Sequence, residues 1–126
     1  MQVATTLSWL WNPFVFEGLH DFARFFSEFP QEKLGVLLDV GRLYQIGIEL
    51  SEAVRLFNHK LLDVHIHDAT LGGNVCEATN LPIGKGTINF PDFISVLRHA
   101  GYDGWLTLEI RGSEKEIVEG KDFLEA

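Results

Sequence analysis

Residues 61–68 read Leu-Leu-Asp-Val-His-Ile-His-Asp, a largely apolar run that changes to polar side chains at its end. A short run of this kind predicts a β-strand over residues 61–66, with His67 at its carboxyl end. Two further apolar runs end on an acidic residue: Gly35-Val36-Leu37-Leu38-Asp39 and Trp105-Leu106-Thr107-Leu108-Glu109. Because the carboxyl ends of neighbouring parallel strands converge on one face of a barrel, the three terminal residues are expected to meet there.

Segments with a helical period separate the predicted strands. Apolar residues recur at three- and four-residue steps over residues 16–29, with charged residues between them. The expected order along the chain is strand 5–11, helix 16–29, strand 34–40, helix 51–59 with Ser51 as N-cap, strand 61–66, a helix opened by Asn89 and Pro91 and closed at Gly101, strand 105–110 and helix 113–124. This alternation predicts an α/β fold with a parallel sheet and right-handed crossovers.

The 126 residues hold four such β/α units without a break in composition, and we interpret them as one domain over residues 1–126. A complete eight-unit barrel takes about 250 residues, so the prediction is a half barrel of the TIM type. Four units leave two open sheet edges and one uncovered core face, which is costly for an isolated molecule. We therefore expect a partner that completes the barrel, either a second copy in a homodimer or an N-terminal half-barrel.

Net charge and composition indicate which classes of partner and which cellular compartment to expect. A formal net charge of −8 at pH 7 gives no basic surface for a phosphate backbone, so nucleic acid is not expected. The single cysteine, Cys76, cannot form an internal disulfide, which fits a reducing compartment. No apolar stretch reaches about 18 residues, and the N-terminus lacks the features of a signal peptide. The expectation is a cytoplasmic protein without a membrane partner.

The residues at the three strand ends predict a metal site. Asp39, His67 and Glu109 would supply a hard, mixed oxygen and nitrogen set suited to a divalent cation. Asp39 has a structural alternative as a turn or helix cap. Of the two histidines in this strand, only one is expected to face the site, and His67 is the better candidate because it lies nearer the strand end. His65 is then expected as a packed, hydrogen-bonded residue on the helix-facing side.

Glu109 is the strongest single candidate for a functional residue, because burying an unpaired carboxylate after four mostly apolar residues costs free energy. A cation or a neighbouring arginine must offset its charge. Arg111 lies two residues further on and shares a strand face with Glu109, so an Arg111–Glu109 pair is the alternative to a metal.

A long loop follows the strand at residues 61–66, and a loop of this length is usually functional or mobile. Its segment Gly84-Lys85-Gly86 resembles a phosphate-cradling turn only loosely, so a tight loop is the first interpretation. Asp68 could cap this loop or orient His67. Near the first predicted strand, Trp9 belongs to an aromatic cluster that could line a substrate site or pack in a core or interface.

The order of four motifs carries a resemblance to a known family: Leu38-Asp39-Val40-Gly41, then His65-Ile66-His67-Asp68, then residues 81–90 (LPIGKGTINF), then Gly101-Tyr102-Asp103-Gly104-Trp105 with Leu108-Glu109. From about Leu7 onward the chain resembles the C-terminal half of the xylose-isomerase-like barrel superfamily, within it the sugar phosphate isomerases and epimerases. The resemblance implies a sugar or sugar phosphate substrate and a divalent metal such as manganese, magnesium, cobalt or zinc. In the family the metal is held by Glu, Asp, His and Glu, and Asp39, His67 and Glu109 match the last three.

Two positions depart from the family pattern. The first family glutamate falls in residues 7–12, where Ser8 stands at the ligand position. Family epimerases use two metal-bound glutamates as paired acid and base, so Glu109 is the catalytic base that remains. Arg42 stands where the family usually has a histidine that touches substrate. The candidate substrate-binding residues are therefore these four: Trp9, Arg42, His65 and Lys85.

The resemblance implies metal-assisted proton transfer next to a ketose carbonyl. The alternative is a truncated or catalytically impaired barrel half with a structural or a metal- or sugar-binding role. A nuclease similar to endonuclease IV is less expected, because its metal cluster needs an Asp-x-His motif where this chain has Ala78-Thr79-Asn80.

Overall fold

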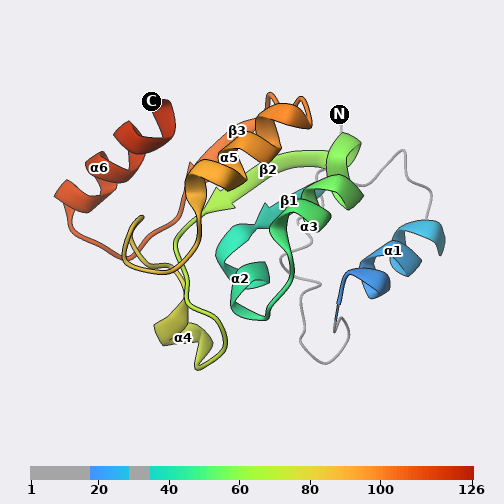
Figure 1. The fold of residues 1–126 in the computed structure, drawn as a ribbon, viewed down its shortest axis with the longest axis horizontal. Coiled ribbons are helices and arrows are strands. Elements are labelled where there is room, and N and C mark those ends of the chain that lie inside the picture. Colours follow the sequence, from blue (N-terminus) through green and yellow to red (C-terminus); the bar gives the residue numbers. More distant parts are fainter. Residues whose placement is uncertain (1–17, 29–34) are drawn as a thin grey trace.

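Three parallel strands form the sheet in the described part of the chain. The structure is a computed structural model in which residues 18–28 and 35–126 are described. Strands β1 (Val36–Asp39), β2 (Leu61–Ile66) and β3 (Trp105–Leu108) lie in the order β1-β2-β3 (Figure 1). The predicted strand over residues 5–11 lies outside the described residues. The prediction of an α/β fold with a parallel sheet is confirmed for the other three strands.

The strand register aligns the carboxyl ends of the three strands. Asp39 pairs with His65, and Ile66 pairs with Leu108. The backbone N–H of Glu109 donates to the carbonyl oxygen of Ile66 at 2.9 Å, which continues the pairing one residue past β3. The residues that follow β2 and β3 therefore leave the sheet at the edge where β1 ends.

Helices connect and flank the strands, as in part of a TIM barrel. They are α1 (Leu19–Glu28), α2 (Val40–Gln45), α3 (Leu50–Phe57) with a following 3-10 turn (Asn58–Lys60), α4 (Val75–Ala78), α5 (Phe90–His99) and α6 (Glu114–Glu125). Figure 1 shows α2, α3 and α5 in front of the sheet, with α1 and α6 at opposite ends of the molecule. The helices in front of the sheet supply the other half of its hydrophobic core.

The core lies between the sheet and these helices. Alternate strand residues turn toward the helices and are almost fully buried: Val36, Leu38, Val64 and Ile66. Helices α3 and α5 pack against these strand residues with buried apolar side chains of their own: Ala53, Val54, Phe57, Phe90, Phe93 and Leu97. Phe22 of α1 packs edge-to-face on Phe57, with ring centroids 5.6 Å apart, and joins α1 to this core.

Three predicted element boundaries were wrong. The strand predicted over residues 34–40 ends at Asp39, because the Asp39 carboxylate accepts from the Arg42 N–H and starts α2 at once. Helix α3 begins at Leu50 with Glu49 as its N-cap, and Ser51 donates to the Glu49 carboxylate. Strand β3 ends at Leu108, two residues earlier than expected.

The later helix ends follow their sequence signals. Asn89 caps α5, and its side chain accepts from the backbone N–H of Asp92. Gly101 ends that helix with φ +73°, a conformation that glycine adopts without a Cβ clash. Ser113 and Glu116 form a reciprocal capping box at the start of α6.

The long loop after β2 is organised around a buried carboxylate. Asp68 is 1% exposed and accepts from the backbone N–H groups of Ala69 (2.8 Å), Gly84 (2.9 Å) and Ile88 (3.2 Å). A Cβ at Gly86 would overlap the Asp68 carboxylate and the backbone of Ala69. Of the two roles predicted for the Asp68 side chain, capping the loop is confirmed.

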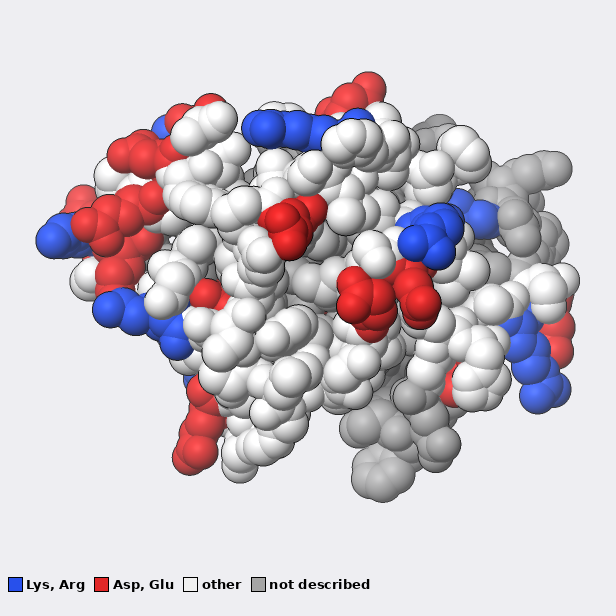
Figure 2. Space-filling model, in the orientation of Figure 1, with Lys and Arg blue, Asp and Glu red and all other residues white. Residues whose placement is uncertain are grey.

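The surface is mixed in charge. On the face that Figure 2 shows, acidic side chains alternate with isolated lysines and arginines over a largely uncharged surface. Among the helices of the described ranges, none combines the length and the apolar composition needed to cross a membrane.

Candidate metal centre

Three side chains from three strand ends meet at the carboxyl edge of the sheet. Asp39 ends β1, His67 follows β2 and Glu109 follows β3. Each offers one potential ligand atom, and these atoms lie within 4.8 Å of one another. The expected meeting of these three residues is confirmed, and it follows from the parallel register.

Asp39 makes three contacts from its position at the start of α2. Its Oδ1 accepts from the backbone N–H of Arg42 at 3.0 Å and lies 2.7 Å from Nε2 of His67. Its Oδ2 lies 4.0 Å from Nε of Arg42, the edge of ion-pair range. Asp39 therefore caps the helix, as its structural alternative predicted, and also faces the candidate metal centre.

His67 is fully buried, and its two ring nitrogens have different partners. The backbone N–H of Asn80 donates to Nδ1 at 2.8 Å. An amide N–H can only donate, so Nδ1 accepts in this contact and Nε2 carries the hydrogen that points at Asp39. Nδ1 also lies 3.4 Å from the carbonyl oxygen of Asp68. A cation would bind Nε2 in the other tautomer, in which Nδ1 carries the hydrogen and faces that carbonyl oxygen. The surroundings thus direct Nε2 toward the two carboxylates. Gly41 packs on the other edge of the ring, where a Cβ would overlap Cε1 and Nδ1.

Glu109 is the most exposed of the three, with half of its side chain accessible. Its Oε2 contacts Nδ1 of His65 at 3.2 Å, whereas Oε1 makes no hydrogen bond within the described ranges. Arg111, the alternative partner from the sequence, donates instead to the carbonyl oxygens of Cys76 and Thr79. The Arg111–Glu109 pair was a wrong prediction, because Arg111 lies beyond the end of β3 and turns back over α4.

His65 faces the candidate metal centre, so the expectation that only one histidine would do so was wrong. Residues two apart in a strand share a face, and Val64 and Ile66 are the ones that turn toward the helices. The same period brings Asp63 onto this face, with Oδ2 3.5 Å from Nε2 of His65. Sequence reasoning missed Asp63, although its two-residue spacing from His65 was a usable signal.

Asn80 is a second residue that the sequence did not single out. It is the one non-glycine residue with positive φ (57°) within the described ranges. Its backbone N–H reaches His67, and its side-chain amide donates to the carbonyl oxygen of Glu109 at 3.0 Å. Asn80 therefore hydrogen-bonds both His67 and Glu109. Asparagine tolerates this backbone conformation better than most residues, but no sequence pattern placed it beside the strand ends.

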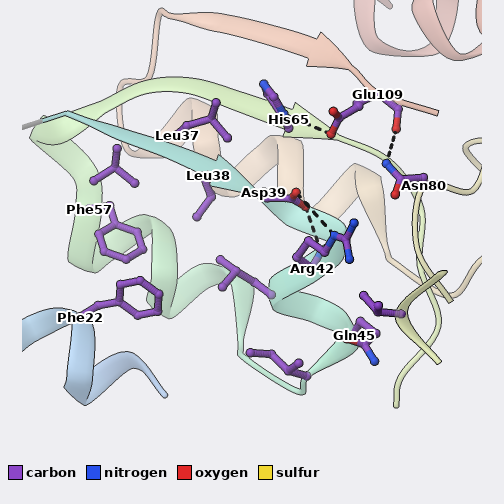
Figure 3. A pocket seen from close by; sticks show the side chains of 14 residues that line it. Phe22, Leu37, Leu38, Asp39, Arg42, Gln45, Phe57, His65, Asn80 and Glu109 are labelled. Carbon is purple, nitrogen blue, oxygen red and sulfur yellow. Dashed lines mark hydrogen bonds and ion pairs between the residues drawn. The ribbon is translucent and has the colours of Figure 1, made fainter. Parts of the chain in front are cut away.

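A cavity of about 760 Å³ opens beside Asp39 and Glu109, and the buried His67 is not part of its lining. Figure 3 shows that its two ends differ: Asp39, Arg42, His65, Asn80 and Glu109 lie toward one end, and Phe22 and Phe57 toward the other. Arg42 is the one cationic side chain among the described residues that line this cavity. The cavity therefore joins a polar rim with one cation to an apolar floor, a combination suited to a small polar ligand.

The predicted substrate-binding residues are not all brought to this cavity. Arg42 and His65 line it. Lys85 lies on an exposed loop outside the lining, where its charge is near Glu116. Hydrogen bonds from the Ser113 backbone and hydroxyl are the main cause of a lowered pKa at Glu116, with a smaller effect from Lys85. Trp9 lies outside the described residues.

The residues present fit a divalent cation. Two carboxylates and one imidazole form the donor set, with Nε2 of His67 directed at Asp39 and Oε1 of Glu109 left over. The backbone N–H groups of Arg42 and Asn80 hold the side chains of Asp39 and His67, and His65 contacts Glu109. These contacts fix the orientation of the three candidate ligands. Such a mixed oxygen and nitrogen set suits manganese, zinc or related cations.

Comparison with known families supports the architecture that the fold suggests. The family model described as "Xylose isomerase-like TIM barrel" matches residues 6–126. The chain belongs to this family. An uncharacterized protein of Methanocaldococcus jannaschii, MJ1311, is 28% identical over 100 residues, which cover 78% of this chain and 32% of that protein.

Solved structures share the same architecture. A D-tagatose 3-epimerase-like protein is 25% identical with a TM-score of 0.70, over 86% of this chain and 40% of that one. The IOLI protein, whose structure holds a bound zinc atom, is 17% identical with a TM-score of 0.61, over 84% of this chain and 39% of that one. The chain thus spans about two fifths of these structures and about a third of the curated relative.

Proposed function

We propose that this chain carries the metal-binding part of a sugar or sugar phosphate isomerase or epimerase. The observation that carries the proposal is the meeting of Asp39, His67 and Glu109 from three neighbouring strands, within 4.8 Å of one another. The family and the likeness to a D-tagatose 3-epimerase-like protein support a ketose as substrate.

The three residues would hold a divalent cation such as manganese, magnesium, cobalt or zinc. When bound, such a cation supplies stabilisation of the negative charge that develops on oxygen as a proton leaves the neighbouring carbon. Glu109 would act as ligand and as the base that takes this proton, because its carboxylate is half exposed beside the cavity. Asp39 and His67 would hold the cation in place of the hydrogen bond that joins Oδ1 of Asp39 and Nε2 of His67.

Arg42 and the cavity floor would bind the substrate. The Arg42 guanidinium lies at the polar rim, where it could donate to hydroxyl or phosphate oxygens. Phe22 and Phe57 line the opposite end and offer the substrate an apolar surface. His65 is a candidate for substrate contact from the same rim, and Lys85 and Trp9 remain candidates only by the sequence argument.

The missing first glutamate shapes the reaction that we propose. With Ser8 at that ligand position, Glu109 is the one remaining member of the acid–base pair. Isomerisation or one-sided proton exchange is therefore favoured over full epimerisation, unless Glu17 or a partner subunit supplies the second group. A metal- or sugar-binding role without turnover is the second candidate, and the same absent glutamate favours it.

Proton exchange with solvent tests the reaction directly. The manganese-loaded chain is incubated in D₂O with D-tagatose, D-fructose or their phosphates, and the sugar protons next to the carbonyl are followed by NMR. We expect their signals to disappear with the parent chain and to persist with Glu109→Gln, which keeps the shape of the side chain but not the base. Exchange by the Glu109→Gln variant at the parent rate would remove Glu109 from the mechanism.

We further propose that a partner covers the open side of the sheet. β1 and β3 are the outer strands of the described sheet, and Trp105 of β3 is 79% exposed. The partner would be a second copy or an N-terminal half-barrel, because the matched structures are more than twice as long as the aligned chain. The molecular mass in solution distinguishes a homodimer from a monomer that awaits a different partner.

A further inference from the structure

A line of polar side chains runs across the site-facing side of the sheet toward Glu109. Thr107 Oγ1 lies 3.0 Å from each carboxylate oxygen of Asp63. Oδ2 of Asp63 lies 3.5 Å from Nε2 of His65, and Nδ1 of His65 lies 3.2 Å from Oε2 of Glu109. The line starts in the middle of the sheet and ends at the candidate metal centre, where Figure 3 shows His65 and Glu109 pointing toward each other.

Strand geometry brings these residues together. Asp63 and His65 are two apart on β2, and Thr107 and Glu109 are two apart along β3 and its end, so all four point to the same side. His65 pairs with Thr107 in the register, which places Asp63 and Glu109 diagonally on either side of that pair. The line is therefore built into the backbone pairing rather than into a loop.

The chemistry of these contacts shows which atoms donate and which accept the hydrogen bonds. A carboxylate oxygen only accepts, so each nitrogen of His65 that bonds a carboxylate must donate, and the contacts to Glu109 and Asp63 form together only when both ring nitrogens carry a hydrogen. This contact uses Oε2 of Glu109 and leaves Oε1 without a hydrogen bond within the described ranges. A glutamate loses rotamer freedom when it binds a metal, and a side chain already held by a partner loses less.

We propose that His65 and Asp63 are positioning residues of the metal centre: His65 holds the Glu109 carboxylate, and Asp63, fixed by Thr107, holds the His65 ring. This inference rests on the proposed metal centre and deepens it, and it gives His65 a role other than substrate contact. Loss of such a supporting contact lowers metal affinity by about 10- to 100-fold in proteins.

Two substitutions of His65 separate its two contacts. The amide nitrogen of asparagine lies where Nδ1 of histidine lies, so His65→Asn keeps a donor for Glu109. The amide nitrogen of glutamine reaches the place of Nε2, so His65→Gln keeps the Asp63 contact and loses the donor for Glu109. In manganese titrations of the metal-stripped chain by calorimetry, we expect His65→Gln to lose about 10- to 100-fold in affinity. His65→Asn keeps the donor for Glu109 and gives up only the Asp63 contact, so it is expected to lose less affinity than His65→Gln and about as much as Asp63→Asn.

A double-mutant cycle tests whether Asp63 acts through His65. Asp63→Asn is expected to weaken manganese binding in the parent background and to have no further effect in the His65→Asn background. A purely structural role for Asp63 would lower affinity equally in both. Glu119→Gln on the outer face of α6 is the matched control, because it removes the same charge at a distance from the line. Circular dichroism and urea unfolding of each variant check that the fold is kept.

The outcomes separate this inference from the proposed function. Failure of the parent chain to bind manganese, or unchanged binding by His67→Ala, overturns the metal centre and the inference with it. Binding that His67→Ala abolishes but His65→Gln leaves at the parent affinity overturns the inference alone. Losses for Asp63→Asn that are equal in both backgrounds assign Asp63 to charge or folding rather than to positioning.

Discussion

The two faces of the sheet differ more than any other two regions of the described molecule. On the helix-facing side, Val64 and Ile66 of β2 are 0% exposed and belong to a continuous apolar core. On the opposite side, Asp63 and His65 of the same strand stay partly exposed and lead to the candidate metal centre. Adjacent residues of one strand thus contribute either to the core or to the candidate metal centre. Substitutions on the helix-facing side should mainly lower the unfolding free energy, and those on the opposite side should mainly lower metal affinity.

The largest effect is expected where the two faces meet, at Gly41. Alanine normally stabilises a helix interior by about 1 kcal/mol relative to glycine. At this position of α2 a Cβ would overlap the buried ring of His67, so Gly41→Ala should instead lower the unfolding free energy and abolish manganese binding. Urea unfolding and calorimetry measure the two losses. A variant that gains stability and still binds manganese would show that His67 has room to move.

Neighbouring leucines of β1 offer a sharper comparison of the two faces. Both leucines border the cavity, but Leu38 is 1% exposed and belongs to the core, whereas Leu37 is half-buried on the other side of the strand. We expect Leu38→Ala to cost about 2–5 kcal/mol of unfolding free energy, as for other buried leucines. Leu37→Ala is expected to cost about 1 kcal/mol, because less of its side chain leaves water on folding. Equal losses in urea unfolding would contradict the division between a packed face and an open one.

The smallest effect concerns alkaline pH and Tyr102. Burial, with smaller contributions from the charges of Asp63 and Asp103, raises the pKa of Tyr102 to about 12 from its ordinary value of 10.0. Between these values the unfolded chain has lost the phenol proton and the folded chain has kept it. The unfolding free energy should therefore fall as the pH rises from 10 to 12, and this contribution should be absent in Tyr102→Phe.

Urea unfolding of the parent and Tyr102→Phe across this pH range measures the difference. The phenylalanine variant also loses the hydrogen bond that Tyr102 donates to the carbonyl oxygen of Trp105, so it should start less stable and decline less steeply. Identical pH slopes for the two chains would show that Tyr102 ionises alike in the folded and unfolded states.

The convergence of the strand ends could be predicted from the sequence because it follows from local rules. Apolar runs that end on Asp39 and Glu109, with helices between them, require parallel strands, and parallel strands align their carboxyl ends. The same reasoning failed for α2, because the segment Val36–Val40 is uniformly apolar apart from Asp39 and hides the point where a strand becomes a helix.

Other contacts of the candidate metal centre depend on the path of the long loop. Asn80 reaches His67 and Glu109 only because the loop returns to the strand ends, and Arg111 turns to α4 for the same reason. No periodicity encodes such a return. Asp63, in contrast, was within reach of the sequence, since the two-residue spacing of Asp63, His65 and His67 places all three on one side.

The proposed function depends on a metal site at the carboxyl ends of the three strands. Crystals of the chain grown with manganese, with diffraction recorded where manganese scatters anomalously, test it most directly. We expect one anomalous peak bounded by Asp39, His67 and Glu109, and none at that position in His67→Ala crystals. An empty position between these side chains in manganese-saturated crystals, or a peak that His67→Ala leaves in place, would contradict the account.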